Sequence, residues 1–401
     1  MLDKKNKKSN LQGITHLIKE AIIGITDLVE EMQERIVHPP FLPSTPIQHI
    51  ITNISKITYK NIRWSTHFFG NGIDKLLGKL TPLFGEIKTT KEKEVVRSVL
   101  NGIIGDYLEK EENPLQIIMQ FRHQEKTLSL DNESLKKSYS AINGKILLMV
   151  HGSCMSDIQW TKKGNNHNEV LAEELHKTPI YLLYNSGRHI SLNGQCLNKL
   201  LEELVLNWSV PVEELIIIAH SMGGLITRSA LYYGQQQEKK WTKHLKKIVF
   251  LGTPHHGASL ERAGNYLDVI LEAIPYTKPF ARLGKIRSAG VTDLRYGNLI
   301  HEDWQDNDRF KLQADQRKFI PLPKGITCFS IAACSSKALS TISAKFIGDK
   351  LVSINSALGQ HKDPTKSLNF KKKNTWIAYE NTHTDLLYNP EIYVKIKEWF
   401  V

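Results

Sequence analysis

Cysteine is scarce in this sequence, with four residues among 401, and none of the four has the spacing of a metal-binding motif. They are Cys154, Cys196, Cys328 and Cys334. A chain of this length can bury a sizeable core without cross-links. We therefore interpret the cysteines as reduced thiols rather than as a disulfide framework, and the sequence predicts no metal and no cofactor.

The sequence also lacks a long uninterrupted apolar run. The N-terminus, MLDKKNKKSN, is basic, but the segment that follows is broken by Lys19, Glu20 and Asp27. It therefore reads as an amphipathic helix rather than a signal peptide. The longest apolar stretch begins at Leu215, is too short to span a bilayer and contains a histidine. These features predict a cytoplasmic protein and leave association with a membrane surface open.

Acidic residues are outnumbered, because 53 lysines and arginines face 41 aspartates and glutamates, which gives a net charge of +12 and a pI of about 9.3. A basic balance favours anionic partners such as membrane surfaces, nucleic acid or acidic substrates. No nucleic-acid module accompanies it, so we expect a lysine-rich solvated surface and no nucleic-acid partner. The lysines of the first ten residues favour either peripheral contact with anionic lipid or packing on the rest of the chain or on a second subunit.

Two regions differ in pattern. Residues 1 to about 112 show apolar positions at helical spacing, around 14–29, 73–83 and 95–107, with no strand signal. The proline-rich tract HPPFLPSTP breaks the first of these stretches. We predict an N-terminal helical region over 1–112, followed by a second domain over 113–401.

The second region alternates short apolar runs with helical segments. IIMQFRH and TLSLD predict an antiparallel hairpin, and the later runs are KILLMVHG, PIYLLYN, ELIIIAH, KKIVFLG and GITCFSIAA. Strands that are buried on both faces and separated by helices indicate a mostly parallel sheet with crossover connections. We expect an α/β fold in which the hairpin forms the antiparallel edge of this sheet.

One strand end carries a candidate nucleophile. The run ELIIIAH leads into Ala219-His-Ser-Met-Gly-Gly224, after which helical periodicity resumes. This is the strand–turn–helix context of the G-x-S-x-G elbow, with alanine at the first small position, and it places Ser221 at the turn. The backbone N–H of Met222, at the start of the helix, is a candidate oxyanion donor.

The preceding strand supplies the second candidate donor. It ends in His151-Gly152-Ser153-Cys154, where glycine lets the backbone fold over the nucleophile. We assign the donor to the N–H of Ser153, with Cys154 as the neighbouring alternative. His151 precedes the turn and is interpreted as a structural residue. No feature nearby marks the thiol of Cys154 as activated.

The base and the acid are assigned from the order of the triad residues along the chain. In folds with this nucleophile elbow the order is serine, acid, histidine. His383 is the last histidine of the chain and lies in a polar turn before the C-terminal helix, so it is the candidate general base. Asp349, flanked by glycine and followed by an apolar pair, is the preferred acid, which would hold the histidine tautomer. Asp363, in a turn, is the rival.

Together these segments resemble the lipase and esterase branch of the α/β-hydrolase superfamily, and most of all bacterial proteins with a GPI-inositol-deacylase-like lipase domain. The residues that carry the resemblance are His151-Gly152, Ala219–Gly224, LGTPHHGA from Leu251, Gly348-Asp-Lys-Leu-Val352 and Asn381–Leu387. In such lipases the acid motif usually reads G-D-G-x-V-P, and Lys350 and Ser353 depart from it here. The resemblance extends from the hairpin to the C-terminus.

The resemblance implies a Ser-His-Asp hydrolase that cleaves carboxylic esters, of lipid or acyl type, through an acyl-enzyme. It implies that LGTPHHGA, with His255 and His256, braces the site, and that an insertion over about 259–324 forms a cap. The apolar face of its helix, 260–274, would line an acyl pocket or simply pack in the core. Asp385 stands where some secreted lipases place a calcium ligand. Acyl transfer by the same triad and a non-catalytic scaffold are the alternative functions.

Overall fold

The computed structural model describes residues 91–139, 142–162, 164–258, 287–306, 315–337, 348–349 and 351–400. Contacts divide the chain into one unit of residues 1–90 and 278–283 and another of residues 91–277 and 284–401. All the described residues belong to the second unit. The expected helices at 14–29 and 73–83 and the helix at 260–274 lie outside them.

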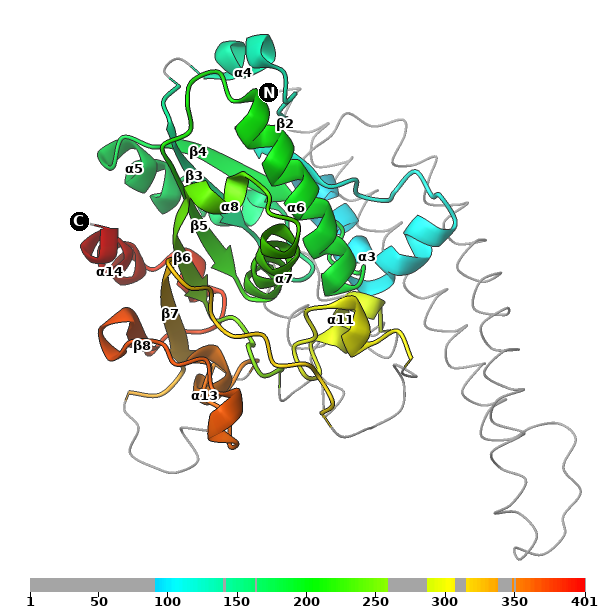
Figure 1. The fold of residues 1–401 in the computed structure, drawn as a ribbon, viewed down its shortest axis with the longest axis vertical. Helices are drawn as coiled ribbons and strands as arrows, with labels where there is room; N and C mark the ends of the chain where they lie inside the picture. The colour runs from blue at the N-terminus through cyan, green and yellow to red at the C-terminus, as the bar shows by residue number, and fades with distance from the viewer. Residues whose placement is uncertain are drawn as a thin grey trace, which may run out of the picture. The chain divides into compact units, whose positions relative to one another are not determined.

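An eight-stranded sheet forms the centre of this unit (Figure 1). Its strands are β1 Gln120–His123, β2 Lys126–Thr127, β3 Lys145–Val150, β4 Thr178–Leu183, β5 Glu214–His220, β6 Leu245–Leu251, β7 Thr327–Cys334 and β8 Thr375–Tyr379. They lie in the order β2-β1-β4-β3-β5-β6-β7-β8. Strands β3 to β8 are parallel to one another, whereas β1 pairs antiparallel with β2 and β4. The predicted parallel sheet with an antiparallel hairpin edge is confirmed.

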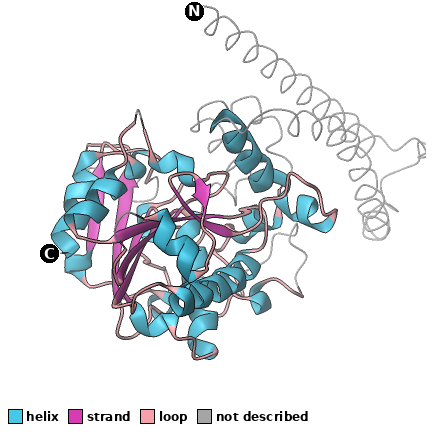
Figure 2. Ribbon diagram, turned by 90° about the horizontal axis from the view of Figure 1, so that it is seen from above, coloured by secondary structure: helices cyan, strands magenta, loops and turns pink. Residues whose placement is uncertain are grey.

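Helices connect and flank the strands. They are α3 Lys91–Lys110, α4 Asn132–Ser138, α5 His167–Glu174, α6 Ile190–Asn207, α7 Met222–Gln236, α8 Trp241–His244, α11 Ala289–Asp293, α13 Ile354–Ala357 and α14 Pro390–Phe400. Short 3₁₀ turns are η2 Asp157–Trp160, η4 His301–Asp303, η5 Pro364–Lys366, η6 Lys372–Asn374 and η7 Asp385–Leu387. Helices lie on both sides of the sheet (Figure 2). The chain reverses its direction across the sheet at β4, so crossovers of the usual right hand place α5 on one face and α6 and α7 on the other.

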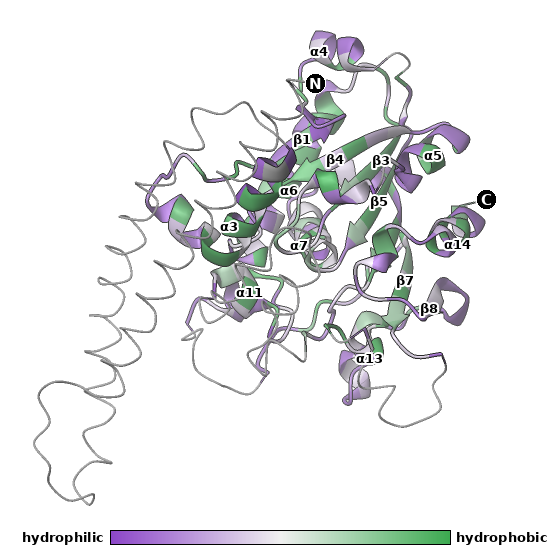
Figure 3. Cartoon of the chain, turned by 180° about the vertical axis from the view of Figure 1, so that it is seen from behind, coloured by the Kyte–Doolittle hydropathy of each residue, from purple (hydrophilic) through white to green (hydrophobic). Residues whose placement is uncertain are grey.

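The central strands are buried on both faces, which explains their unbroken apolar runs. Residues 215–219 of β5 and 146–150 of β3 have no exposed surface. In Figure 3 the strands β5 and β7 carry the hydrophobic colour, whereas α4 at the periphery is hydrophilic. Burying one such aliphatic side chain contributes about 1.5–3 kcal/mol relative to leaving it exposed. This rigid layer fixes the positions of the loops at its carboxyl edge.

Helix α3 belongs to the same compact unit as the sheet, and this unit therefore begins at Lys91. The sequence groups this helix with the N-terminal helical region that was expected to end near residue 112, because its periodicity continues the helical pattern. The helical periodicity does not predict that α3 contacts the loops after β3 and β4. None of the described helices is long and apolar enough to cross a membrane.

Candidate active site

Ser221 lies in a sharp turn between the central strand β5 and helix α7. Its backbone is in the left-handed region, with φ 53° and ψ −124°, which is uncommon for a residue other than glycine. Its N–H donates to the carbonyl of Leu251 at 2.8 Å, which ties the turn to the end of β6. The side chain is 1% exposed, and its hydroxyl hydrogen bonds to no described residue.

Two glycines after the serine allow this turn to form. A Cβ atom on Gly223 would lie 2.5 Å from the carbonyl oxygen of His151 and 2.7 Å from that of Val150. A Cβ atom on Gly224 would lie 2.0 Å from Oγ1 of Thr253. The helix therefore starts in contact with the ends of β3 and β6, which requires small residues at these positions.

Asp349 and His383 are brought together from loops 34 residues apart. The Nδ1 atom of His383 lies 2.6 Å from Oδ2 of Asp349, and both side chains are buried. The second carboxylate oxygen of Asp349 accepts hydrogen bonds from the N–H groups of Leu351 at 2.9 Å and Val352 at 2.8 Å. The carboxylate is thus fixed in orientation, while Nε2 of His383 is buried and hydrogen bonds to no described group.

Asp363, the rival acid, occupies a different environment. Its carboxylate accepts from the N–H and hydroxyl of Thr365 and caps the 3₁₀ turn η5. The hydrogen bonds with Thr365 lower the pKa of this side chain. No hydrogen bond or ion pair joins it to His383 among the described residues, so the geometry favours Asp349.

The ends of β3, β5 and β6 bring the serine and the histidine to one edge of the sheet. His220, which precedes Ser221, donates from Nε2 to the carbonyl of His383 at 3.1 Å, and the two rings are 4.8 Å apart. A Cβ atom on Gly152 would lie 3.0 Å from Cβ of Ser221. One on Gly252 would lie 2.9 Å from Cε1 of His383. Both glycines are therefore packed directly against the site.

Two backbone N–H groups near Ser221 are available to a ligand. Those of Met222 and Ser153 donate to no acceptor among the described residues, although both residues are buried. The N–H of Cys154, the alternative donor, is engaged by the hydroxyl of Ser186 at 3.0 Å. The geometry thus favours Met222 and Ser153 as the pair of oxyanion donors.

His151 and the Cys154 thiol are unsuited to proton transfer or attack. Burial lowers the pKa of His151 to about 3, and its ring stacks on Tyr184 at 4.1 Å. Burial raises the pKa of the Cys154 thiol to about 12. At neutral pH the imidazole is uncharged and the thiol protonated, which agrees with their interpretation as structural groups.

The loop after β6 carries a buried histidine, His255, and a partly buried one, His256, both with structural contacts. His255 lies 3.3 Å from the Arg228 guanidinium, whereas His256 contacts the carbonyl of Gly359 at 3.0 Å. Burial, together with the charge of Arg228, holds the pKa of His255 well below its ordinary value. Both rings are neutral packing elements that brace this loop, as expected from the sequence.

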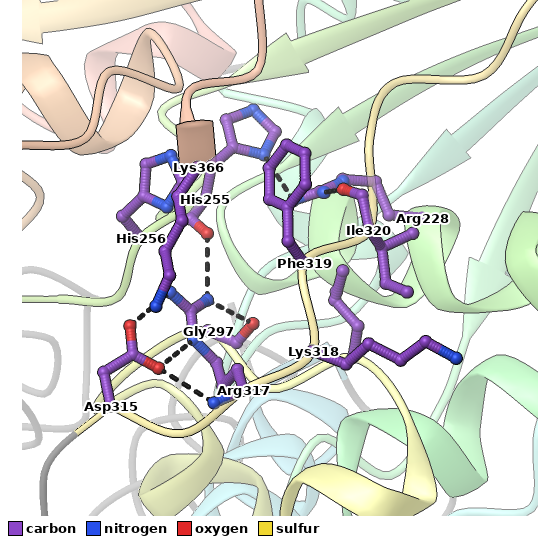
Figure 4. A pocket seen from close by; sticks show the side chains of 11 residues that line it. Arg228, His255, His256, Gly297, Asp315, Arg317, Lys318, Phe319, Ile320 and Lys366 are labelled. Atoms are coloured by element: carbon purple, nitrogen blue, oxygen red, sulfur yellow. Dashed lines mark hydrogen bonds and ion pairs between the residues drawn. The ribbon is translucent and has the colours of Figure 1, made fainter. Parts of the chain in front are cut away.

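A small pocket lies beside this brace (Figure 4). Arg317 fills one wall, donating to Asp315 and to the carbonyls of His255 and Gly297. Arg228 donates to the carbonyl of Ile320 across the pocket. The two arginines therefore anchor the segment 315–320, and none of the candidate catalytic side chains lines this pocket.

Asp385, where a calcium ligand was considered, is occupied by local hydrogen bonds. Its Oδ2 accepts from the N–H and hydroxyl of Thr382 and closes the turn that carries His383. No group of three or more His, Cys, Asp or Glu side chains that could hold a metal exists among the described residues.

Helix α3 contacts the loops that follow β3 and β4, and the sequence pattern did not predict these contacts. Asn185 donates to the carbonyl of Gly105 at 2.8 Å, and a Cβ atom on Gly187 would lie 2.2 Å from the carbonyl oxygen of Asn101. Glycines three residues apart, at 102 and 105, were the available signal, because glycine inside a helix often marks a close backbone approach.

Comparison with known proteins adds a family to this geometry. The family model for the PGAP1-like alpha/beta domain matches residues 141–341, which is half of the chain. The chain belongs to this family. The predicted resemblance to GPI-inositol-deacylase-like hydrolases and the α/β-hydrolase fold are thereby confirmed. No curated protein matches the chain.

Several solved structures are similar to the chain at low identity. The mature lipase BlEst2 of Bacillus licheniformis is 16% identical, with 64% of this chain and 94% of the lipase covered and a TM-score of 0.42. The esterase Pf2001 of Pyrococcus furiosus is 12% identical, with 64% and 81% covered and a TM-score of 0.37. The phospholipase PlaB of Legionella pneumophila is 14% identical, with 53% and 45% covered and a TM-score of 0.35.

Proposed function

We propose that this protein is a serine hydrolase that cleaves carboxylic esters through an acyl-enzyme on Ser221. His383 acts as general base, Asp349 orients it, and the N–H groups of Met222 and Ser153 bind the oxyanion. One observation carries the proposal. A buried histidine is held by a buried carboxylate at 2.6 Å, while its Nε2 and the hydroxyl of Ser221 are both buried and have no hydrogen-bond partner among the described residues.

The histidine tautomer follows from this contact. Because an ionised carboxylate only accepts hydrogen bonds, Nδ1 of His383 carries the hydrogen that points to Asp349. Nε2 is then the unprotonated, basic nitrogen. It takes the proton of Ser221 as the hydroxyl oxygen attacks the ester carbonyl, and the Asp349 carboxylate stabilises the imidazolium that forms.

The remaining steps use the same groups in reverse order. The tetrahedral intermediate places its negative oxygen against the N–H groups of Met222 and Ser153, whose contribution is greatest in a water-excluded site. His383 returns the proton to the leaving alcohol and the acyl-enzyme remains. A water molecule, deprotonated by Nε2, then attacks the acyl carbon. The bond from that carbon to Oγ of Ser221 breaks, Nε2 returns the proton to Oγ, and the acid is released.

The proposed substrates are lipid or other acyl esters. The PGAP1-like alpha/beta domain family supports an ester, and lipases are named among the solved structures that share the fold. The basic net charge of +12 is compatible with substrates presented on an anionic surface. The cap proposed over residues 259–324 would decide the acyl-chain length.

A panel of p-nitrophenyl esters of increasing chain length tests the proposal with the full chain and its Ser221→Ala variant. We expect hydrolysis by the wild-type protein and a loss of about 10⁴-fold or more in the variant. Added alcohol acceptors, with analysis of the products, separate hydrolysis from acyl transfer. A folded wild-type protein that is no faster than Ser221→Ala, with detergent or lipid present, would favour the scaffold alternative.

A further inference from the structure

Cys154 has an unusual backbone conformation beside the proposed oxyanion hole. Its φ is 60°, in the left-handed region, although it carries a side chain. For a residue other than glycine or asparagine this conformation is unfavourable and persists only where surrounding contacts enforce it. Ser221, at the neighbouring strand end, has the same feature at the nucleophile turn. An equivalent constraint at Cys154 calls for a structural cause.

The first enforcing contact comes from the loop after β4. The hydroxyl of Ser186 accepts a hydrogen bond from the N–H of Cys154 at 3.0 Å. Ser186 is 1% exposed, and its own carbonyl oxygen would lie 2.1 Å from a Cβ atom placed on Gly290. The backbone of Ser186 therefore packs closely against Gly290. From this fixed position its hydroxyl can hold the peptide that joins residues 153 and 154 through the N–H of Cys154.

The second enforcing contact comes from helix α3. A Cβ atom on Gly102 would lie 2.2 Å from Sγ and 2.9 Å from Cα of Cys154. The helix is held at this point, since Ser288 donates to the carbonyl of Gly102 at 2.6 Å. A non-helical residue, Ile104, marks a kink immediately beyond it. Helix α3 therefore packs directly against the Cα atom and the side chain of Cys154.

We propose that Ser186 is a positioning residue for the oxyanion hole, and that Gly102 of α3 backs it by confining Cys154. The inference rests on the proposed function, whose oxyanion donor at Ser153 it explains. The hydrogen bond to Ser186 fixes the peptide plane on the C-terminal side of Ser153. Gly152, packed against Ser221, fixes the other side. The N–H of Ser153 is held between these two constraints.

This arrangement affects the transition state more than the bound substrate. The oxyanion develops only as Ser221 attacks, so a misdirected N–H at residue 153 weakens catalysis without removing substrate contacts. Removing an oxyanion donor costs about 10²–10³ in kcat in a serine protease. Loosening its support should cost less, and we expect a fall of about tenfold.

Ser186→Ala tests the hydrogen bond, with Ser229→Ala as the matched control. Ser229 is also buried, and its hydroxyl donates to the carbonyl of Leu299 at 2.6 Å, on a different segment. For an ester that the wild type hydrolyses, we expect Ser186→Ala to lower kcat about tenfold with KM within about twofold. Ser229→Ala should keep the wild-type kcat, and both variants should melt at similar temperatures.

Gly102→Ala tests the contact from the helix. The added methyl group must displace Cys154, so we expect kcat to fall about tenfold as in Ser186→Ala. Cys154→Ala removes the sulfur that lies nearest to the added group, and its own kcat is measured to complete the double-mutant cycle. Combined with Gly102→Ala, it should restore part of the lost kcat, because the close approach to the Cα atom of Cys154 remains. Such recovery is a coupling that independent destabilisation would not produce.

The outcomes separate this inference from the proposed function. Wild-type hydrolysis that is lost in Ser221→Ala establishes the function by itself. If Ser186→Ala then has the kcat of Ser229→Ala, or if Cys154→Ala does not relieve Gly102→Ala, the positioning role is overturned while the function stands. A fall in kcat at constant KM, with recovery in the double variant, supports it.

Discussion

The two halves of the candidate site are built differently. On the serine side, Ser221 is placed mainly by backbone conformation and close packing, with glycines at 152, 223 and 224 where strands and helix meet. On the acid–base side, Asp349 and His383 are placed by hydrogen bonds across loops that are distant in sequence. The serine side therefore depends on shape, and the acid–base side on polar contacts.

This difference predicts two kinds of sensitivity. A polar substitution of equal size should disable the acid–base side while the protein stays folded, because the hydrogen bonds and not the volume are lost. A single added methyl group should damage the serine side and destabilise the fold together, because the backbone must move. The following variants test the contrast in order of decreasing effect.

His383→Ala should have the largest effect. Removing the imidazole leaves Ser221 without a base, so we expect kcat for an ester substrate to fall about 10⁴-fold or more. His361→Ala, which alters a part-buried histidine outside the site, should keep wild-type activity. Equal activities in the two variants would remove His383 from the mechanism.

Asp349→Asn should lower kcat by about 10³–10⁴-fold, because an amide in place of the carboxylate disfavours the tautomer in which Nε2 is basic. Asp363→Asn is the matched control, because it makes the same substitution at the rival aspartate. We expect it to retain wild-type kcat. The reverse ranking of the two variants in steady-state assays would assign the acid to Asp363.

Gly223→Ala should lower kcat about tenfold or more and reduce the free energy of unfolding by roughly 1–3 kcal/mol, because its methyl group meets two backbone carbonyls. Gly325→Ala is the control. A Cβ atom on Gly325 has no neighbour within 4 Å, and the only cost of the substitution there is its left-handed φ of 79°. We expect it to cost about 1 kcal/mol in urea unfolding and nothing in activity. Equal activity losses in the two variants would contradict the steric account.

The smallest effect should be on acid stability. Burial, aided by the charges of Arg317 and Arg228, lowers the pKa of His256 from 6.5 to about 4. The unfolded chain therefore binds a proton that the folded chain does not over this range. The free energy of unfolding should fall as the pH drops from about 6.5 to 4, and less steeply in His256→Gln. If the free energy of unfolding, measured with urea, falls equally steeply with pH in both proteins, the pKa of His256 is not lowered in the folded protein.

Much of the fold could be predicted because its strands are buried on both faces. The runs at 145–150 and 214–220 match β3 and β5 at both ends, and the C-terminal helix matches α14. The order of strands in the sheet could not be predicted, because every central strand has the same apolar character. The candidate site residues could be proposed because the elbow is a local pattern and the chain order then limits the choice of acid and base.

The supporting contacts were out of reach for a physical reason. The bond between Ser186 and Cys154 joins two ordinary polar residues 32 positions apart, with no pattern that pairs them. Helix α3 has the same helical periodicity as the region before it. Only its packing against the loops after β3 and β4 places it in the compact unit that contains the sheet. Long-range contacts of this kind depend on the assembled sheet.

The most direct test of the central claim is the reaction of the full-length protein with a fluorophosphonate probe, followed by mass spectrometry to locate the adduct. The proposed mechanism predicts a single adduct on Ser221 in the wild-type protein and in Asp363→Asn. It predicts no adduct in Ser221→Ala or His383→Ala. An adduct on another residue, or labelling of Ser221 that is unchanged in His383→Ala, would contradict an activated serine that depends on this histidine.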